Sequence, residues 1–224
     1  MDRAVHDQKS VARNGPARLA AGTLLSAALA LVCLGAASRN PLGALRQFSR
    51  WSLERRGARF LGSNLARLQP SLDDCGPTAL ADLLELTGRR VPPADSLRLL
   101  ASTSADGTTI EALATAAARA GLQLFEVRWD PEEFAQLPLP SLVWVERNHF
   151  VVVARRDRTD SVDVLDPAAG HYRMAGARFA RLWSGAALIQ LERIGLRREP
   201  DDPSGSRPLR LRGTRATRIR ATEV

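Results

Sequence analysis

The chain has 224 residues, enough for one domain of ordinary size with appended segments, and its 45% hydrophobic and 25% charged content is typical of a globular protein. The formal net charge of +8 is unevenly spread: residues 1–59 carry +7, residues 60–194 carry −3 and residues 195–224 carry +4. A nucleic-acid binder usually shows a basic stripe on its folded domain, so this distribution argues against a nucleic-acid partner.

The first 59 residues predict a protein that is held at a membrane or exported. Residues 1–18 form a basic N-terminal region, and residues 19–37 contain no charge over about the length that spans a bilayer. This segment is either a transmembrane anchor or a signal peptide cleaved before Ser38. Both of its flanks are basic, so the side of the membrane stays open. Residues 38–59 are predicted to be a basic linker with a short amphipathic helix along the membrane surface.

Residues 60–194 are predicted to fold as the central domain. Apolar periodicity and capping residues predict helices in its first half, and short β-branched and aromatic runs predict strands in its second half. The helices are expected at 75–86, 93–102 and 109–120, the strands at 122–128, 141–145, 149–154, 162–165 and 187–191, and a helical turn at 177–183. Helices followed by a mostly antiparallel sheet make an α+β fold. Residues 195–224, rich in Arg and without apolar periodicity, are predicted to be a disordered tail.

Cys75 is the candidate nucleophile of this domain. It begins the predicted helix 75–86, where the first backbone N–H groups have no partner in the helix and favour a negative charge. A thiol in this place loses its proton more easily, and the thiolate is the reactive form. The preceding Asp73 and Asp74 oppose this effect, so the thiol needs a basic partner. Gly76 is expected to let a substrate backbone approach the sulfur.

The basic partner is expected to be His149. Of the three histidines, His6 precedes the apolar segment and His171 is expected in a surface turn. His149 begins an apolar strand that would hold its imidazole at the edge of a cleft, and Asp166 ends the next strand. If these strands form a hairpin, His149 and Asp166 lie side by side, and the carboxylate holds the imidazole in the right tautomer.

Gln69 and the backbone N–H of Cys75 are the predicted donors to the oxyanion of a tetrahedral intermediate. The motif that begins at Asp106 (Asp-Gly-Thr-Thr) is predicted to be a turn and a helix cap rather than part of the site. Cys75, His149 and His171 lack the paired spacing of zinc ligands, so we expect no metal and no organic cofactor.

In combination these motifs resemble the bacteriocin-processing cysteine peptidases, papain-like domains that cut leader peptides after a Gly-Gly pair and are usually fused to an ABC exporter. The resemblance covers about residues 65–191 and rests on these stretches: Gln69, Asp-Cys-Gly-Pro-Thr-Ala-Leu-Ala around Cys75, Asp106-Gly-Thr-Thr, Ala120-Gly-Leu, His149-Phe-Val-Val-Val and Asp166-Pro-Ala-Ala-Gly. It implies a papain-like fold, with Cys75 as nucleophile, His149 as base, Asp166 as its orienting group and Gln69 as oxyanion donor.

The sequence therefore predicts a cysteine peptidase that acts on a peptide or protein substrate through an acyl-enzyme. The substrate expected from the resemblance is a Gly-Gly leader peptide, and an ABC exporter would be a separate partner, because no GxxxxGK[ST] loop is present. Two alternatives stay open. One is a domain of the same fold that binds a peptide without cutting it, and the other is a different acyl-transfer enzyme, such as a transglutaminase or an amidase.

Overall fold

The structure is a computed structural model that describes residues 40–146 and 149–190. The predicted basic N-terminal region, the apolar segment 19–37 and the tail 195–224 lie outside the described residues. Among the helices that the structure describes, none has both the length and the apolar character needed to cross a bilayer. The described residues from Leu45 onward belong to one compact unit.

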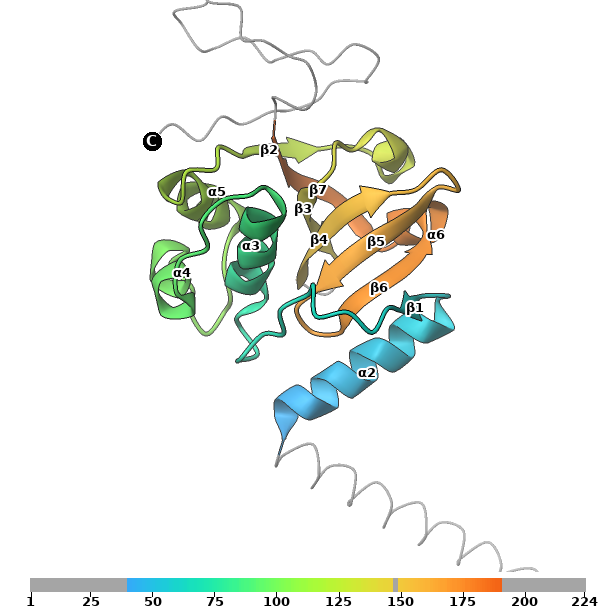
Figure 1. The fold of residues 1–224 in the computed structure, drawn as a ribbon, viewed down its shortest axis with the longest axis horizontal. Helices are drawn as coiled ribbons and strands as arrows, with labels where there is room; N and C mark the ends of the chain where they lie inside the picture. Colours follow the sequence, from blue (N-terminus) through green and yellow to red (C-terminus); the bar gives the residue numbers. More distant parts are fainter. Residues whose placement is uncertain (1–39, 147–148, 191–224) are drawn as a thin grey trace, which may run out of the picture. The chain divides into compact units, whose positions relative to one another are not determined.

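A seven-stranded sheet forms the middle of this unit, with the strand order β1-β6-β5-β4-β3-β7-β2 (Figure 1). Every pair of neighbouring strands is antiparallel. The strands are β1 (Arg59–Phe60), β2 (Phe125–Arg128), β3 (Ser141–Val145), β4 (His149–Arg156), β5 (Ser161–Asp166), β6 (Gly170–Ala175) and β7 (Trp183–Ile189).

Helices cover both faces of the sheet. They are α2 (Pro41–Arg55), α3 (Cys75–Leu86), α4 (Ala94–Leu100), α5 (Ile110–Arg119), the 3-10 helix η1 (Pro131–Gln136) and α6 (Gly176–Ala180). Figure 1 shows α3, α4 and α5 grouped on one side of the sheet. The predicted order of helices first and antiparallel strands afterwards is confirmed, and so is the α+β class.

The alternation of side chains along β4 divides the core into two layers. Phe150 and Val152 pack with the leucines and alanines of α3 and α5, whereas Val151 and Val153 pack against the layer that contains η1 and α6. Each of these four side chains is at most 2% exposed. A strand that is buried on both faces reads as a continuous apolar run, which explains why this strand could be recognised in the sequence.

Two expectations for the fold differ from the structure. Strand β6 was not predicted, and His171 does not lie in a surface turn: it is the second residue of β6 and is only 8% exposed. The interpretation as a turn was wrong because β6 pairs polar side chains with β5 on one face, where Arg173 binds Asp163. Residues 38–59, expected as a linker with a short amphipathic helix, contain the 15-residue helix α2 and the first residue of β1, so a helix in this stretch is confirmed and its place along a membrane surface stays a prediction.

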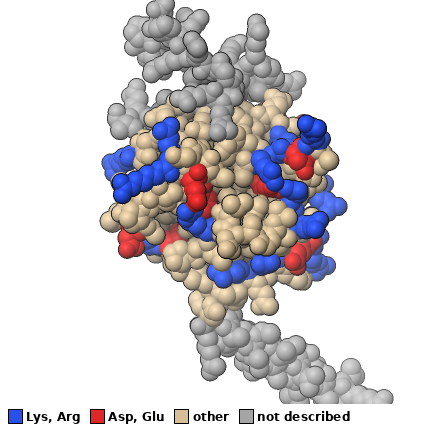
Figure 2. Space-filling model, in the orientation of Figure 1, with Lys and Arg blue, Asp and Glu red and all other residues tan. Residues whose placement is uncertain are grey.

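Charges of both signs are interspersed on the face of the domain that Figure 2 shows. Some of the described surface charges pair locally, such as Arg56 with Glu146 at 2.9 Å, where the two side chains are 41% and 49% exposed. Exposed pairs of this kind contribute little to stability. Their main consequence is that this face carries a mixed charge rather than a field of one sign.

Candidate active site

Cys75 is the first residue of α3, as the sequence predicts. Asp74 occupies the N-cap position and its carbonyl accepts the N–H of Thr78 at 3.1 Å, but its side chain makes no cap hydrogen bond. Gly76 has a packing role besides the expected role toward a substrate, which stays a prediction. A Cβ added to it would lie 3.1 Å from the Cβ of Thr108 and 3.3 Å from Leu113, so the glycine allows α3 to pack closely against α5 and the loop before it.

The hairpin of β4 and β5 brings the predicted histidine and aspartate together. Nε2 of His149 lies 2.8 Å from Oδ1 of Asp166. The same oxygen accepts the backbone N–H groups of Ala168 and Ala169 at 2.7 and 3.1 Å. The side chain of Asp166 is 6% exposed, so the carboxylate is held in place by its hydrogen bonds. The imidazole of His149 also lies close enough to the thiol of Cys75 for each group to shift the pKa of the other.

The surroundings of Cys75 and His149 favour a thiolate–imidazolium pair. Burial acts to raise the pKa of the Cys75 thiol, but the hydrogen bond and positive charge of His149, together with the backbone N–H groups of Phe150 and Gly76, bring this pKa below its ordinary value. Burial acts to lower the pKa of His149, but the charge and hydrogen bond of Asp166, followed by those of Cys75, raise it to about 10. These opposite shifts in pKa favour the form of the pair in which the proton lies on the imidazole rather than on the sulfur.

Gln69 lies in the loop before α3 and is 4% exposed. Its Nε2 donates to the carbonyls of Ser71 and Leu72 at 2.8 and 3.1 Å, and its own backbone N–H donates to the carbonyl of Pro167 at 2.9 Å. The last bond places the loop before Cys75 next to the residue that follows Asp166. Since both amide hydrogens of Gln69 already have acceptors here, its role as an oxyanion donor stays a prediction.

A cavity of about 290 Å³ opens beside the thiol. Its lining residues are Leu72, Asp73, Cys75, Ala105, Asp106, Gly107, Thr108, Trp144 and Phe150. The rings of Trp144 and Phe150 meet edge to face, with centroids 4.6 Å apart. The motif that begins at Asp106 was expected only as a turn and cap. Thr109 does cap α5 by accepting the N–H of Ala112, but the three residues before Thr109 also line this cavity.

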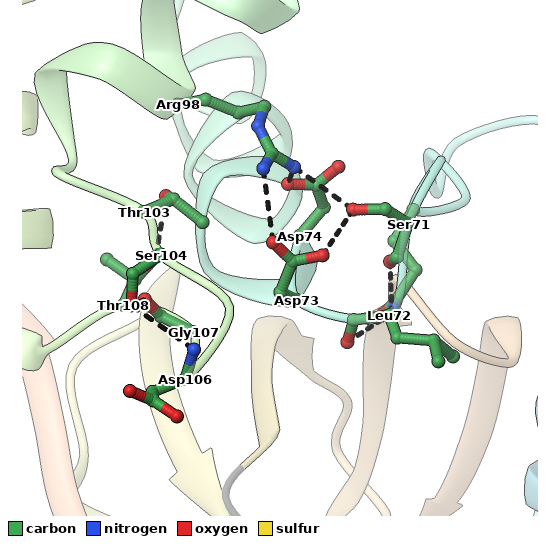
Figure 3. Close-up of polar contacts among 11 residues, drawn as sticks. Ser71, Leu72, Asp73, Asp74, Arg98, Thr103, Ser104, Asp106, Gly107 and Thr108 are labelled. Carbon is green, nitrogen blue, oxygen red and sulfur yellow. Dashed lines mark hydrogen bonds and ion pairs between the residues drawn. The ribbon is translucent and has the colours of Figure 1, made fainter.

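Arg98 was not among the predicted site residues, but its guanidinium contacts three residues just before Cys75 (Figure 3). Nη1 donates to Oγ of Ser71 at 3.0 Å and binds the carboxylate of Asp74, and Nη2 donates to Asp73 at 3.1 Å. A signal was present in the sequence, because two adjacent carboxylates before a thiolate call for a cation nearby. Nothing in the sequence showed which of the many arginines supplies it.

His171 does not reach this site. Its Nδ1 is hydrogen-bonded to Oγ of Ser63, and its Nε2 lies 4.0 Å from Asp163. It therefore belongs to a separate polar cluster on β5 and β6. Among residues 40–146 and 149–190, no group of three or more His, Cys, Asp or Glu side chains is arranged to hold a metal ion.

Comparison with known proteins places the arrangement in a family. The model of the peptidase C39 family matches residues 65–193. An uncharacterized protein of Methanothermobacter marburgensis is 30% identical over 130 residues, which are 58% of this chain and 90% of that protein. The pediocin PA-1 transport/processing ATP-binding protein PedD of Pediococcus acidilactici is 35% identical over 124 residues, and this match spans 52% of the chain but only 17% of PedD.

A solved structure is also similar to the domain. It is a double glycine motif protease from an AMS/PCAT transporter, crystallised in complex with the leader peptide. The match has a TM-score of 0.52 and 26% sequence identity, and it covers 55% of this chain and 88% of the other chain.

Proposed function

This chain belongs to the peptidase C39 family of cysteine peptidases, and from this premise we propose that Cys75, His149 and Asp166 hydrolyse a peptide bond in leader peptides that end in a double glycine. The expected papain-like fold is confirmed. One observation supports the proposed residue roles: the imidazole of His149 is hydrogen-bonded to the carboxylate of Asp166 and also acts on the thiol of Cys75 at the start of α3. A buried thiol of purely structural use would need none of these partners.

In the proposed reaction the thiolate of Cys75 attacks the carbonyl carbon of the scissile bond. The C–S bond forms, and the carbonyl oxygen takes the negative charge. The imidazolium of His149 then gives its proton to the leaving amine, the C–N bond breaks and an acyl-enzyme remains. Next, His149 takes a proton from water, and the resulting hydroxide attacks the acyl carbon. The new C–O bond forms, the C–S bond breaks, and the acid and the thiolate of Cys75 are released. Asp166 keeps Nε2 of His149 engaged at 2.8 Å throughout, so that the other ring nitrogen serves the sulfur.

The oxyanion is assigned to the backbone N–H of Cys75 and the amide of Gln69. Gln69 lies in the loop before Cys75 and is buried. To donate to a substrate, its amide must release the carbonyl of Ser71 or Leu72. Loss of one oxyanion donor typically costs about 100- to 1,000-fold in kcat. Gln69→Ala is therefore expected to lower kcat with little effect on KM, and an unchanged kcat would remove Gln69 from the mechanism.

The proposed substrate class rests on the relatives. The similar crystal structure is a double glycine motif protease bound to a leader peptide, and PedD is a transport/processing protein. We infer that this chain likewise cleaves a leader from a peptide destined for export, with an ABC exporter as a separate partner. The apolar segment 19–37 would hold the peptidase at the membrane or direct its export. Cell fractionation of the full chain, compared with a Leu25→Arg/Leu31→Arg variant, tests this part. The parent should either sediment with membranes or be exported after cleavage before Ser38, and the variant should do neither.

A leader-derived peptide aldehyde that ends in Gly-Gly tests nucleophile and substrate class together. The full chain with Cys33→Ala leaves Cys75 as its one thiol, so intact mass reports an adduct at this position. We expect one adduct, no adduct with Cys75→Ala, and a much slower reaction when the peptide ends in Val-Val. An adduct that persists in Cys75→Ala would remove Cys75 as the nucleophile. Equal rates for the two peptides would remove the double-glycine specificity and leave the peptidase chemistry intact.

A further inference from the structure

We propose that Arg98 is a positioning residue of the peptidase site: its guanidinium holds the 71–74 loop in place beside the cavity and neutralises the two carboxylates that precede the nucleophile. This inference rests on the proposed role of Cys75. It concerns a residue of α4 that contacts neither the sulfur nor the imidazole in the contacts described above.

Arg98 makes several hydrogen bonds with the residues that precede Cys75. Its two terminal nitrogens bind Ser71, Asp73 and Asp74, and Oγ of Ser71 in turn donates to Asp73 at 2.6 Å (Figure 3). The side chain of Asp74 is only 4% exposed and that of Asp73 is 21% exposed. A partly buried fork that serves several acceptors uses the planar geometry of arginine, which a lysine does not provide.

The second support is the place of Arg98 between the two sides of the cavity. Leu72 and Asp73 form one side, and residues 105–108 form the other. The second side follows α4 within a few residues and is tied to itself: Ser104 and Gly107 exchange two backbone hydrogen bonds of 3.0 Å, and Oγ1 of Thr103 lies 2.7 Å from that of Thr108. The guanidinium of Arg98 therefore connects the first side of the cavity to α4, the helix that precedes the second side.

The third support is the charge balance around the thiol. His149 approaches from β4 with Asp166 of β5 behind it, Asp73 and Asp74 precede α3, Asp106 lines the cavity, and α5 carries Glu111 in its first turn. Carboxylates outnumber cations in this set, and every uncompensated carboxylate disfavours a thiolate. Arg98 compensates the two that are adjacent in sequence to the sulfur. Hydrogen bonding to Ser71, followed by smaller contributions that include Arg98, lowers the pKa of Asp73, so this carboxylate is charged when the enzyme works.

The test compares three variants of the full chain in the Cys33→Ala background. Arg98→Gln removes the charge and part of the fork, Arg98→Lys keeps the charge without the fork, and Asp73→Asn/Asp74→Asn removes the carboxylates while keeping Arg98. Arg90→Gln, a change at an exposed arginine just beyond α3, is the matched control. For each variant, the rate of Cys75 alkylation by iodoacetamide is followed across pH by intact mass, and kcat and KM are measured on a leader peptide.

We expect Arg98→Gln to raise the midpoint of the alkylation profile by about one pH unit, which lowers the thiolate fraction below the midpoint about tenfold. Arg98→Lys should have the same midpoint as the parent, because it keeps the positive charge. Its KM should be higher than that of the parent, because an ammonium group cannot hold the 71–74 loop with the two terminal nitrogens of a guanidinium. The two Asn substitutions should move the midpoint the other way, downward. Arg90→Gln should match the parent in both measurements.

Equal midpoints in the parent and Arg98→Gln would overturn the proposed neutralisation, and a parent-like KM in Arg98→Lys would overturn the proposed positioning. If Arg98→Gln does not fold, the Asn pair still decides the first question, because a midpoint that does not fall shows that the carboxylates do not act on the thiol. Failure of the proposed function looks different: Cys75→Ala would still cleave the leader, whatever the alkylation profiles show.

Discussion

Strand β5 supplies an aspartate to the histidine of each neighbouring strand, and the two pairs have opposite electrostatics. Asp166 lies 2.8 Å from His149 of β4, whose pKa is raised to about 10. Asp163 lies 4.0 Å from His171 of β6, whose pKa is lowered, first by burial and then by the nearby Arg155 and Arg173. A buried aspartate next to a histidine is therefore not enough to make an imidazolium.

The difference lies in what else each carboxylate binds. Asp163 accepts from Nε of Arg155 at 2.5 Å and from Nε of Arg173 at 2.6 Å, so its charge is already compensated. Asp166 accepts neutral backbone N–H groups from Ala168 and Ala169, which orient the carboxylate without cancelling its charge. The full charge of Asp166 thus acts on His149, and a charged, oriented imidazole is what a thiol nucleophile requires.

Substitution of each histidine by Gln should separate the two pairs most clearly. His149→Gln removes the general acid and base and the partner of the thiolate, so kcat/KM should fall by about 1,000-fold or more. His171→Gln should keep kcat/KM of the folded enzyme within about threefold of the parent. Both are measured on a leader peptide after the folded fraction has been checked by circular dichroism. Similar losses in the two variants would show that the distant cluster takes part in catalysis.

Substitution of Asp166 by Asn should change the pH dependence of activity. Activity needs the thiolate together with a protonated His149, so the profile of the parent should fall only as the pH rises through about 10. Asp166 is what raises this pKa against burial, so in Asp166→Asn the alkaline limb should move down towards the ordinary value of 6.5. At neutral pH kcat should fall by about 100-fold. A profile of kcat/KM from pH 5 to 11 measures both, and an alkaline limb that does not move would show that the imidazole draws its charge from elsewhere.

Substituting Asp163 by Asn should instead affect stability. The change leaves Arg155 and Arg173 facing a neutral amide and should cost about 2 kcal/mol in the free energy of unfolding at neutral pH. Although burial opposes it, hydrogen bonding to Arg173 and Arg155 lowers the pKa of Asp163. A depressed pKa contributes stability above the unfolded value of about 3.9 that is lost as the pH falls through the folded value. The deficit of Asp163→Asn against the parent in urea unfolding should therefore shrink at low pH, and a constant deficit would contradict this account.

Much of the arrangement around Cys75, His149 and Asp166 could be predicted from the sequence. The helix 75–86 and the strand 141–145 have the predicted bounds, because periodicity, a following glycine and β-branched content all indicate the same elements. The juxtaposition of His149 and Asp166 follows from hairpin geometry, since two strands joined by a short turn must bring their outer ends together. The roles of these residues and of Gln69 in catalysis remain predictions.

Two features, the role of Arg98 beside Cys75 and the strand β6, could not be predicted from the sequence, each for a physical reason. Arg98 contacts residues that are 24 to 27 positions away in sequence, and an arginine on a helix needs no partner, so nothing local marks it as part of the site. In β6, His171 and Arg173 find their ionic partner on β5. Such a cross-strand cluster makes one face of a buried strand as polar as a turn, and periodicity alone cannot distinguish the two.

Ser63→Ala is the mildest way to test the separation of the two clusters. Oγ of Ser63 is hydrogen-bonded to Nδ1 of His171, and this bond connects the loop after β1 to β6. Its loss should cost about 1 kcal/mol, because the imidazole nitrogen loses a partner in a buried place. The cost should vanish in a His171→Gln background if the bond is its only source, so a double-mutant cycle in urea unfolding isolates it. Since neither side chain touches the thiol, the alkylation profile of Cys75 should be the same in all four proteins, and a shifted profile would show that the two clusters are coupled through β5.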